Sequence, residues 1–259
     1  MRRPLVAGNW KMNLNLAWGL DLVAAIRAGL DAAEVGERVE VAVCPPAVYL
    51  YPLADALRGS LIRLGAQDIY HEPEGAFTGE LSGAMIAETG AKYVIIGHSE
   101  RRHTIGHLED DWMINLKLKA ARRTGLTPIL CVGETLAERK AGKTFEVLMF
   151  QLTAGLVGVT LKTADDLVIA YEPVWAIGTG QNATPEQAQE AHAQLRTRLR
   201  ELVGPVADTV RILYGGSMKP ENAGELLKQP DVDGGLVGGA SLKADSFVGI
   251  VRAALATGV

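Results

Sequence analysis

The sequence predicts an α/β protein built as a single (β/α)8 barrel over residues 1–259. Three observations lead to this fold. Eight short apolar runs recur along the chain, longer segments with helical periodicity separate them, and no Pro-, Gly- or Ser-rich linker divides the chain. Barrels of this kind run to about 250 residues as one domain. A doubly wound open sheet is the alternative, and open sheets usually contain fewer strands.

The expected strands are apolar on both faces and do not alternate with polar residues. Such runs are typical of parallel strands that are covered on both sides. They lie at residues 4–8, 39–44, 61–66, 92–97, 127–132, 167–171, 210–214 and 234–238. Their regular alternation with helices is what favours the barrel.

The helices between these strands are marked by periodicity and by start signals. Thr184 is a candidate N-cap, because Pro185 and Glu186 follow it as a proline and an acid in a first helical turn. The clearest expected helices cover residues 16–30, 184–203, 219–228 and 242–256.

Composition excludes several classes of protein. Hydrophobic residues make up 48% of the chain and charged residues 22%, which is unlike a disordered protein. The net charge of −4 argues against a nucleic-acid binder. The two cysteines, Cys44 and Cys131, are too few for a disulfide framework, and Cys131 is expected to be a buried structural thiol.

The chain carries no expected export or membrane segment. Two arginines precede the first apolar run, but that run stops at Gly8-Asn9 and is shorter than the roughly 7–15 residues of a signal core. No stretch approaches the ~18 apolar residues that a membrane span needs. We therefore expect a cytoplasmic protein that contacts neither membrane nor nucleic acid.

Polar residues follow the first and fourth strands, where a barrel places its active site. Lys11 could place its positive charge over the mouth of the barrel, although a solvated loop lysine is the alternative. His98 precedes a possible helix start, whose N-terminus would lower the pKa of the imidazole. A histidine held only by local hydrogen bonds is the alternative reading.

A carboxylate ends the sixth strand. Partial burial of Glu172 would raise the pKa of its carboxyl group and suit it to act as a base. The following residues 173–180 combine glycine and proline with Trp175 and Ile177, which predicts a lid with a stiff middle. A plain connecting loop is the alternative.

Glycine pairs follow the seventh and eighth strands. The segments 215–217 and 238–241 read Gly-Gly-Ser and Gly-Gly-Ala-Ser. Backbone N–H groups in such loops can approach an oxyanion, and many barrels hold phosphate there. The sequence contains no cluster with metal-ligand spacing and no dinucleotide-binding fingerprint, so neither a metal nor another cofactor is expected.

Taken together, these stretches resemble the triosephosphate isomerase family. The resemblance rests on residues 9–11, 93–102, 170–180 and 235–241, and it extends in order along the whole chain. It implies an enzyme of glycolysis and gluconeogenesis that interconverts dihydroxyacetone phosphate and D-glyceraldehyde 3-phosphate through an enediol(ate), without a cofactor. Another phosphate-binding barrel enzyme, such as a sugar-phosphate isomerase, or a non-catalytic binding relative would be expected to lack part of the Lys11, His98 and Glu172 set.

The resemblance also implies residue roles. Glu172 would be the base and His98 a neutral electrophile, a pairing for which this family is a standard example. Lys11 would supply positive charge to the substrate. The remaining implied roles are substrate binding by Asn9, Gly178, Ser217, Gly238 and Gly239, orientation of Lys11 by Glu100, a lid latch at Tyr214 and Ser217, covering of Glu172 by Ile177 and Leu236, and pairing of Glu134 with Trp175.

The family resemblance further implies a homodimer. In relatives the loop at residues 68–82 inserts beside the active site of a second subunit, so Thr78 would reach toward the partner. Three departures from the family pattern lie in or near that interface. They are Asp68 in place of asparagine, His107 in place of glutamate, and a segment 106–125 about two residues longer than usual.

Overall fold

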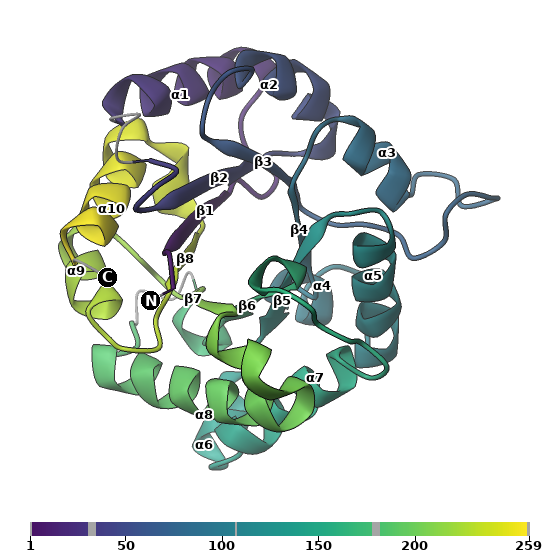
Figure 1. The fold of residues 1–259 in the computed structure, drawn as a ribbon, viewed down its shortest axis with the longest axis vertical. Coiled ribbons are helices and arrows are strands. Elements are labelled where there is room, and N and C mark those ends of the chain that lie inside the picture. Colours follow the sequence, from purple (N-terminus) through teal and green to yellow (C-terminus); the bar gives the residue numbers. More distant parts are fainter. Residues whose placement is uncertain (1, 31–34, 107, 178–181, 258–259) are drawn as a thin grey trace.

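Eight parallel strands close into a barrel in the order in which they occur along the chain. The computed structural model describes residues 2–30, 35–106, 108–177 and 182–257. Figure 1 shows the strands at the centre and the helices in a ring around them. The first strand pairs with the second on one side and with the eighth on the other, so the sheet has no free edge. The predicted (β/α)8 barrel is confirmed.

The strand positions agree with the sequence prediction to within two residues. The strands are β1 Leu5–Asn9, β2 Glu40–Cys44, β3 Arg63–Ala66, β4 Tyr93–Ile96, β5 Thr127–Val132, β6 Val168–Tyr171, β7 Arg211–Tyr214 and β8 Gly234–Val237. Nearly all of their residues are buried, which explains why the sequence runs are apolar without alternation.

Helices cover the outside of the barrel. The α-helices are α1 Leu16–Gly29, α2 Leu50–Ala56, α3 Gly83–Glu88, α4 Ser99–His103, α5 Asp111–Arg123, α6 Leu136–Lys140, α7 Thr144–Gly155, α8 Pro185–Val203, α9 Pro220–Leu227 and α10 Ala244–Ala256. The 3-10 turns are η1 Ala47–Tyr49, η2 Ala164–Asp166, η3 Val174–Ala176, η4 Gly204–Asp208 and η5 Gly239–Leu242. The predicted cap of α8 is present, since the Thr184 side chain accepts a hydrogen bond from the amide of Gln187. No helix in the described ranges is long and apolar enough to cross a bilayer.

The hydrophobic core has two parts. The larger cluster lies between the barrel wall and the helices, and a smaller one fills the interior of the barrel. Both cysteines belong to the interior cluster, and burial raises the pKa of the Cys44 thiol to about 12 and that of Cys131 well above its usual value. The prediction of Cys131 as a buried structural thiol is therefore confirmed.

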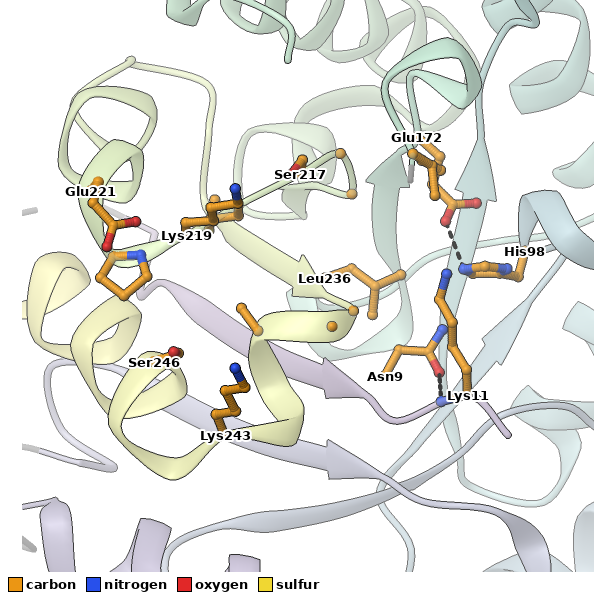
Figure 2. A pocket seen from close by; sticks show the side chains of 18 residues that line it. Asn9, Lys11, His98, Glu172, Ser217, Lys219, Glu221, Leu236, Lys243 and Ser246 are labelled. Atoms are coloured by element: carbon orange, nitrogen blue, oxygen red, sulfur yellow. Dashed lines mark hydrogen bonds and ion pairs between the residues drawn. The ribbon is translucent and has the colours of Figure 1, made fainter. Parts of the chain in front are cut away.

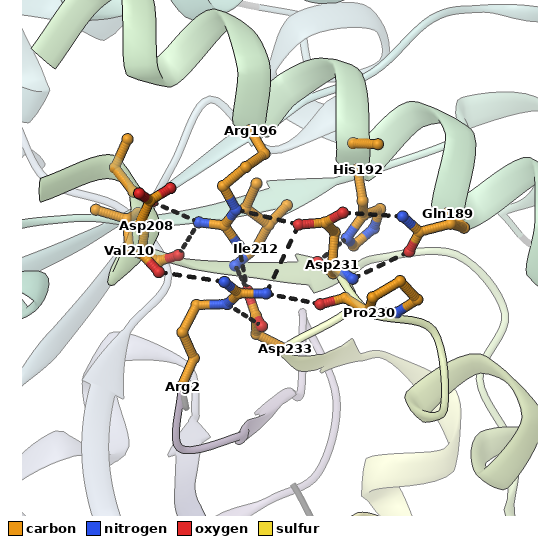
Figure 3. A network of polar contacts seen from close by, with 12 residues as sticks. Arg2, Gln189, His192, Arg196, Asp208, Val210, Ile212, Pro230, Asp231 and Asp233 are labelled. Atoms are coloured by element: carbon orange, nitrogen blue, oxygen red, sulfur yellow. Dashed lines mark hydrogen bonds and ion pairs between the residues drawn. The ribbon is translucent and has the colours of Figure 1, made fainter. Parts of the chain in front are cut away.

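A polar network ties the start of the chain to its last third (Figure 3). The Arg2 Nε donates to Asp233 at 2.6 Å, and another of its nitrogens donates to the carbonyl of Pro230 at 2.6 Å. Arg196, fully buried on α8, donates to the same Asp233 carboxylate at 2.6 Å. Because Asp233 immediately precedes β8, the network fixes the strand that closes the barrel against β1.

Candidate active site

The residues expected at the strand ends meet in one cavity of about 510 Å³. Lys11, His98 and Glu172 all line it, although they come from different strands (Figure 2). The other predicted site residues that line it are Asn9, Ser217, Gly238 and Gly239, together with Ile177 and Leu236. Gly178 lies outside the described residues.

The position of Lys11 depends on a backbone conformation that is uncommon for a residue with a side chain. Its φ angle is +51°, in the left-handed region. The Asn9 Oδ1 accepts the Lys11 amide at 3.0 Å, and the Gln67 side chain donates to the Lys11 carbonyl at 2.8 Å. At the tip of the side chain, Nζ lies 2.8 Å from Glu100 Oε1. The predicted pairing with Glu100 is present.

His98 is held as one tautomer by the helix that follows it. The ring caps α4, and Nδ1 accepts a hydrogen bond from the Glu100 amide at 3.2 Å. A nitrogen that accepts from an N–H group carries no proton, so in the neutral ring the proton belongs on Nε2. That nitrogen lies 2.9 Å from Glu172 Oε1 and donates to it.

Glu172 follows β6 and is almost fully buried, with 2% of its surface exposed. Its second carboxylate oxygen accepts the Ser99 amide at 2.8 Å. Two glycines make room for this residue. A Cβ on Gly133 would lie 1.7 Å from the Glu172 carbonyl oxygen, and one on Gly215 would lie 2.8 Å from Glu172 Cγ. Gly133 thus packs closely against the main chain of Glu172, and Gly215 against its side chain.

Both pKa directions predicted from the sequence were wrong. Desolvation raises the pKa of Glu172, but the neighbouring His98, the Ser99 amide and Lys11 together outweigh burial and lower it. Desolvation lowers the pKa of His98, but the adjacent Glu172 carboxylate outweighs burial and raises it. The sequence could not show that the two side chains touch, and their contact decides both directions.

The root of the predicted lid is anchored on Glu134. Trp175, within η3, donates its indole N–H to Glu134 Oε1 at 2.9 Å, as predicted. The same oxygen accepts from Tyr171 at 3.2 Å and from Arg139 at 3.1 Å. The Arg139 guanidinium also lies 4.4 Å from the centre of the Trp175 ring. The C-terminal part of the predicted lid, residues 178–180, lies outside the described residues, as does His107.

Sequence reasoning missed several residues in and beside the cavity. Gln67 also donates to the Cys44 carbonyl, so it ties the Lys11 loop to β2. Four polar residues at the starts of α9 and α10 line the part of the cavity away from Glu172 and His98. They are Lys219, Glu221, Lys243 and Ser246. Lys219 and Lys243 follow the two glycine loops closely, and that spacing was the available signal.

The departure at Asp68 is compensated by charge. Lys117 Nζ lies 2.7 Å from Asp68 Oδ1, and an Arg101 nitrogen lies 2.9 Å from Asp68 Oδ2. Both cations also contact Glu109, so the four side chains form one cluster. An aspartate at this position therefore acquires two positive partners. Among the described side chains, no group of three or more His, Cys, Asp or Glu residues is arranged to hold a metal ion.

The fold and the cavity define a (β/α)8-barrel enzyme with its site at the C-terminal ends of the strands. The family profile described as triosephosphate isomerase matches residues 4–254. The chain belongs to the triosephosphate isomerase family.

Individual relatives agree with this assignment over nearly their whole length. The triosephosphate isomerase of Carboxydothermus hydrogenoformans is 53% identical, covering 98% of this chain and 100% of that protein. That of Moorella thermoacetica is 54% identical, covering 97% and 99%. The crystal structure of triosephosphate isomerase from Bartonella henselae superposes with a TM-score of 0.87 at 42% identity, covering 97% of this chain and 98% of that one.

Proposed function

We propose that this enzyme interconverts dihydroxyacetone phosphate and D-glyceraldehyde 3-phosphate through an enediol(ate), as a step of glycolysis and gluconeogenesis. Membership of the family over residues 4–254 supports the activity. The observation that carries the site assignment is the meeting of Lys11, His98 and Glu172 in one cavity. A different sugar-phosphate isomerase or a non-catalytic relative is not favoured, because the family match and this residue set both favour the triose reaction.

The proposed base is Glu172. Its carboxylate is ionised in the described arrangement, because His98, the Ser99 amide and Lys11 lower its pKa. It would take a proton from one carbon of the triose and return it to the neighbouring carbon. A substrate oxygen that accepts a hydrogen bond from His98 Nε2 would replace Glu172 as its acceptor. Substrate binding would therefore free the carboxylate for the proton transfer.

The proposed electrophiles are His98 and Lys11. His98 Nε2 would donate to the carbonyl oxygen and then to the enediolate that forms from it. The Glu100 amide supports this role, because its hydrogen bond to Nδ1 keeps the ring donating from Nε2. Lys11 would add positive charge near the same oxygen, and Asn9 and Gln67 keep its backbone in place.

The phosphate would bind at the glycine loops. Ser217, Gly238 and Gly239 line the cavity, and apart from the adjacent residues no heavy atom lies within 4 Å of a Cβ built on Gly239. Gly178 is proposed as a further contact. Residues 173–180 are proposed to close over the substrate, since water would promote loss of phosphate from the enediolate.

We further propose a single catalytic domain, a homodimer and a cytoplasmic location. One closed sheet that includes both the first and the last strand supports the single domain. The loop between β3 and α3, which projects beyond the ring of helices in Figure 1, supports the dimer. Buried free cysteines and a glycolytic role support the location.

A direct assay tests the activity. The purified protein is mixed with D-glyceraldehyde 3-phosphate, and formation of dihydroxyacetone phosphate is followed without added metal or nucleotide. We expect rapid equilibration in both directions. Absence of isomerisation by folded protein, shown by circular dichroism, would refute the proposed function.

A further inference from the structure

The cavity is larger than a triose phosphate requires. A triose phosphate has ten non-hydrogen atoms, and even at the ~30 Å³ that a water molecule takes in the liquid they fill at most ~300 Å³. The cavity measures about 510 Å³. The cavity extends past the glycine loops into a part that we call the outer chamber, which is lined by Met218, Lys219, Pro220, Glu221, Lys243 and Ser246.

The outer chamber lies on the far side of the phosphate site from the catalytic residues. In Figure 2, Glu172 and His98 lie at one end of the cavity, Ser217 and Leu236 between, and Lys219 and Lys243 at the other end. A ligand that filled both the phosphate site and the outer chamber would therefore extend from its phosphate group in the direction opposite to the triose carbons. Only a second group attached to the phosphate meets that requirement.

The charges of the outer chamber favour an anion there. Among the described residues, neither Lys219 nor Lys243 has a carboxylate within 4.0 Å, whereas Lys11 is paired with Glu100. The chamber also contains the carboxylate of Glu221 and the hydroxyl of Ser246. Two lysines against one glutamate leave net positive charge beside the glycine loops.

We propose that the outer chamber binds the second phosphate of a diphosphate whose first phosphate occupies the glycine loops. Lys219 and Lys243 hold that second phosphate by charge-assisted hydrogen bonds, and Ser246 donates to it. Glu221 opposes the binding and limits its affinity. Condensed phosphates are then competitive inhibitors that exclude the triose phosphate from its own site. The proposal rests on the proposed function only for the position of the first phosphate.

The test compares inorganic pyrophosphate with inorganic phosphate as inhibitors, at constant ionic strength and without divalent cations. We expect the wild-type protein to prefer pyrophosphate by about tenfold or more, the size of one charge-assisted contact. The double variant Lys219→Gln/Lys243→Gln is expected to reduce that preference below about threefold. Glu221→Gln is expected to increase it.

A matched control separates the chamber from general surface charge. Lys228 lies at the end of α9, is exposed and does not line the cavity, so Lys228→Gln removes one positive charge from the same helix. This variant is expected to keep the wild-type preference. An equal preference in the wild type and the double variant would overturn the proposal.

Calorimetry distinguishes this proposal from the proposed function. Heat of pyrophosphate binding is measured on the same proteins without any substrate. Lysine-dependent binding by a protein that does not isomerise trioses would support the chamber and refute the activity. An active enzyme whose pyrophosphate binding does not depend on either lysine would support the proposed activity and refute the outer chamber as a phosphate site.

Discussion

At the scale of single residues, Glu172 and His98 contact each other, and the proposed proton transfer depends on this pair. Their contact of 2.9 Å explains why the histidine pKa is raised and the glutamate pKa lowered. The proposed base is thus ionised before substrate arrives, and substrate binding has only to displace a hydrogen bond.

We expect Glu172→Gln to abolish most of the activity while the fold survives. Glutamine preserves the size of the side chain and can still accept from the Ser99 amide, but it cannot take a proton from carbon. The expected loss in kcat is at least ~10²–10⁴, the range of general-base catalysis. Steady-state kinetics measures the loss, and Glu225→Gln, on the exposed face of α9, is the matched control. Activity within tenfold of wild type would contradict the assignment of the base.

A second residue-scale prediction concerns acid stability and His192. Desolvation in a fully buried position lowers the pKa of His192 to about 4, and its Nδ1 lies 3.0 Å from the Asp231 carbonyl. In the unfolded chain the pKa is near 6.5, so only the unfolded state gains this proton between pH 6.5 and about 4. The free energy of unfolding therefore falls by up to ~3 kcal/mol across that window and is unaffected above it.

His192→Phe provides the measurement. Urea unfolding is followed from pH 8 to pH 4 for both proteins. The variant is less stable at every pH because it lacks the Asp231 contact. The difference in free energy of unfolding between the two proteins is nevertheless expected to narrow as the pH falls below about 6.5. A gap that stays constant over the whole range would show that His192 does not contribute to the acid sensitivity.

At the scale of elements, the sequence predicted the start of the lid and the starts of helices. It did not predict which side chains from different elements contact each other. The strands were predictable because each is buried on both faces, and α8 because a threonine, a proline and a glutamate mark its start. The pKa directions failed because no sequence pattern reports that the ends of β4 and β6 bring two side chains within 3 Å. The lysines of the outer chamber were missed because an exposed lysine after a glycine loop is also an ordinary surface residue.

Ile177 is predicted to keep water away from the base. It lines the cavity with Glu172, at the end of η3. Truncation by Ile177→Ala opens space beside the carboxylate, so we expect methylglyoxal released per isomerised triose to increase severalfold. Leu61→Ala removes a similar apolar group from an exposed position and should leave the ratio unchanged. An unchanged ratio in Ile177→Ala would mean that this side chain does not exclude water.

The cap of α8 should contribute measurably to stability. The Thr184 hydroxyl accepts from the Gln187 amide at 3.2 Å, and the Gln187 side chain accepts from the Thr184 amide at 3.1 Å. We expect Thr184→Ala to lower the free energy of unfolding by ~1 kcal/mol and Thr184→Ser to leave it nearly unchanged. Chemical denaturation compares the three proteins, and equal losses in both variants would show that the hydroxyl is not the source.

At the scale of the whole molecule, the segments that follow the first three strands carry exposed apolar side chains. Met12 is 95% exposed and Val48 77%, and Tyr51, Phe77 and Met85 are exposed as well. Met12, Val48 and Tyr51 follow the first two strands, Phe77 belongs to the loop at residues 68–82, and Met85 lies on α3. Exposed apolar side chains of this kind would be buried in the proposed dimer. The barrel was predictable from one chain, but the dimer was accessible only through resemblance.

We therefore expect sedimentation to give a dimer with an interface of roughly 2,000 Å² or more in total. Thr78→Arg places a charge in the expected contact and should produce monomers with reduced activity. Thr160→Arg adds the same charge at an exposed position before β6 and should leave the dimer intact. A wild-type protein that sediments as a fully active monomer at micromolar concentration would contradict the proposed assembly.

The closure of the barrel by its first and last strands also affects how the protein is made. Gly234 follows Leu5 by 229 residues, and ribosomes add about 5–20 residues per second. The first strand therefore leaves the ribosome about 10 to 50 s before its second neighbour exists. Until then the backbone groups along one edge of β1 lack their strand partners, and Arg2 lacks its hydrogen bond to Asp233. A pause in translation late in the message extends this exposed period, so codon choice near the 3′ end should influence the yield of folded enzyme.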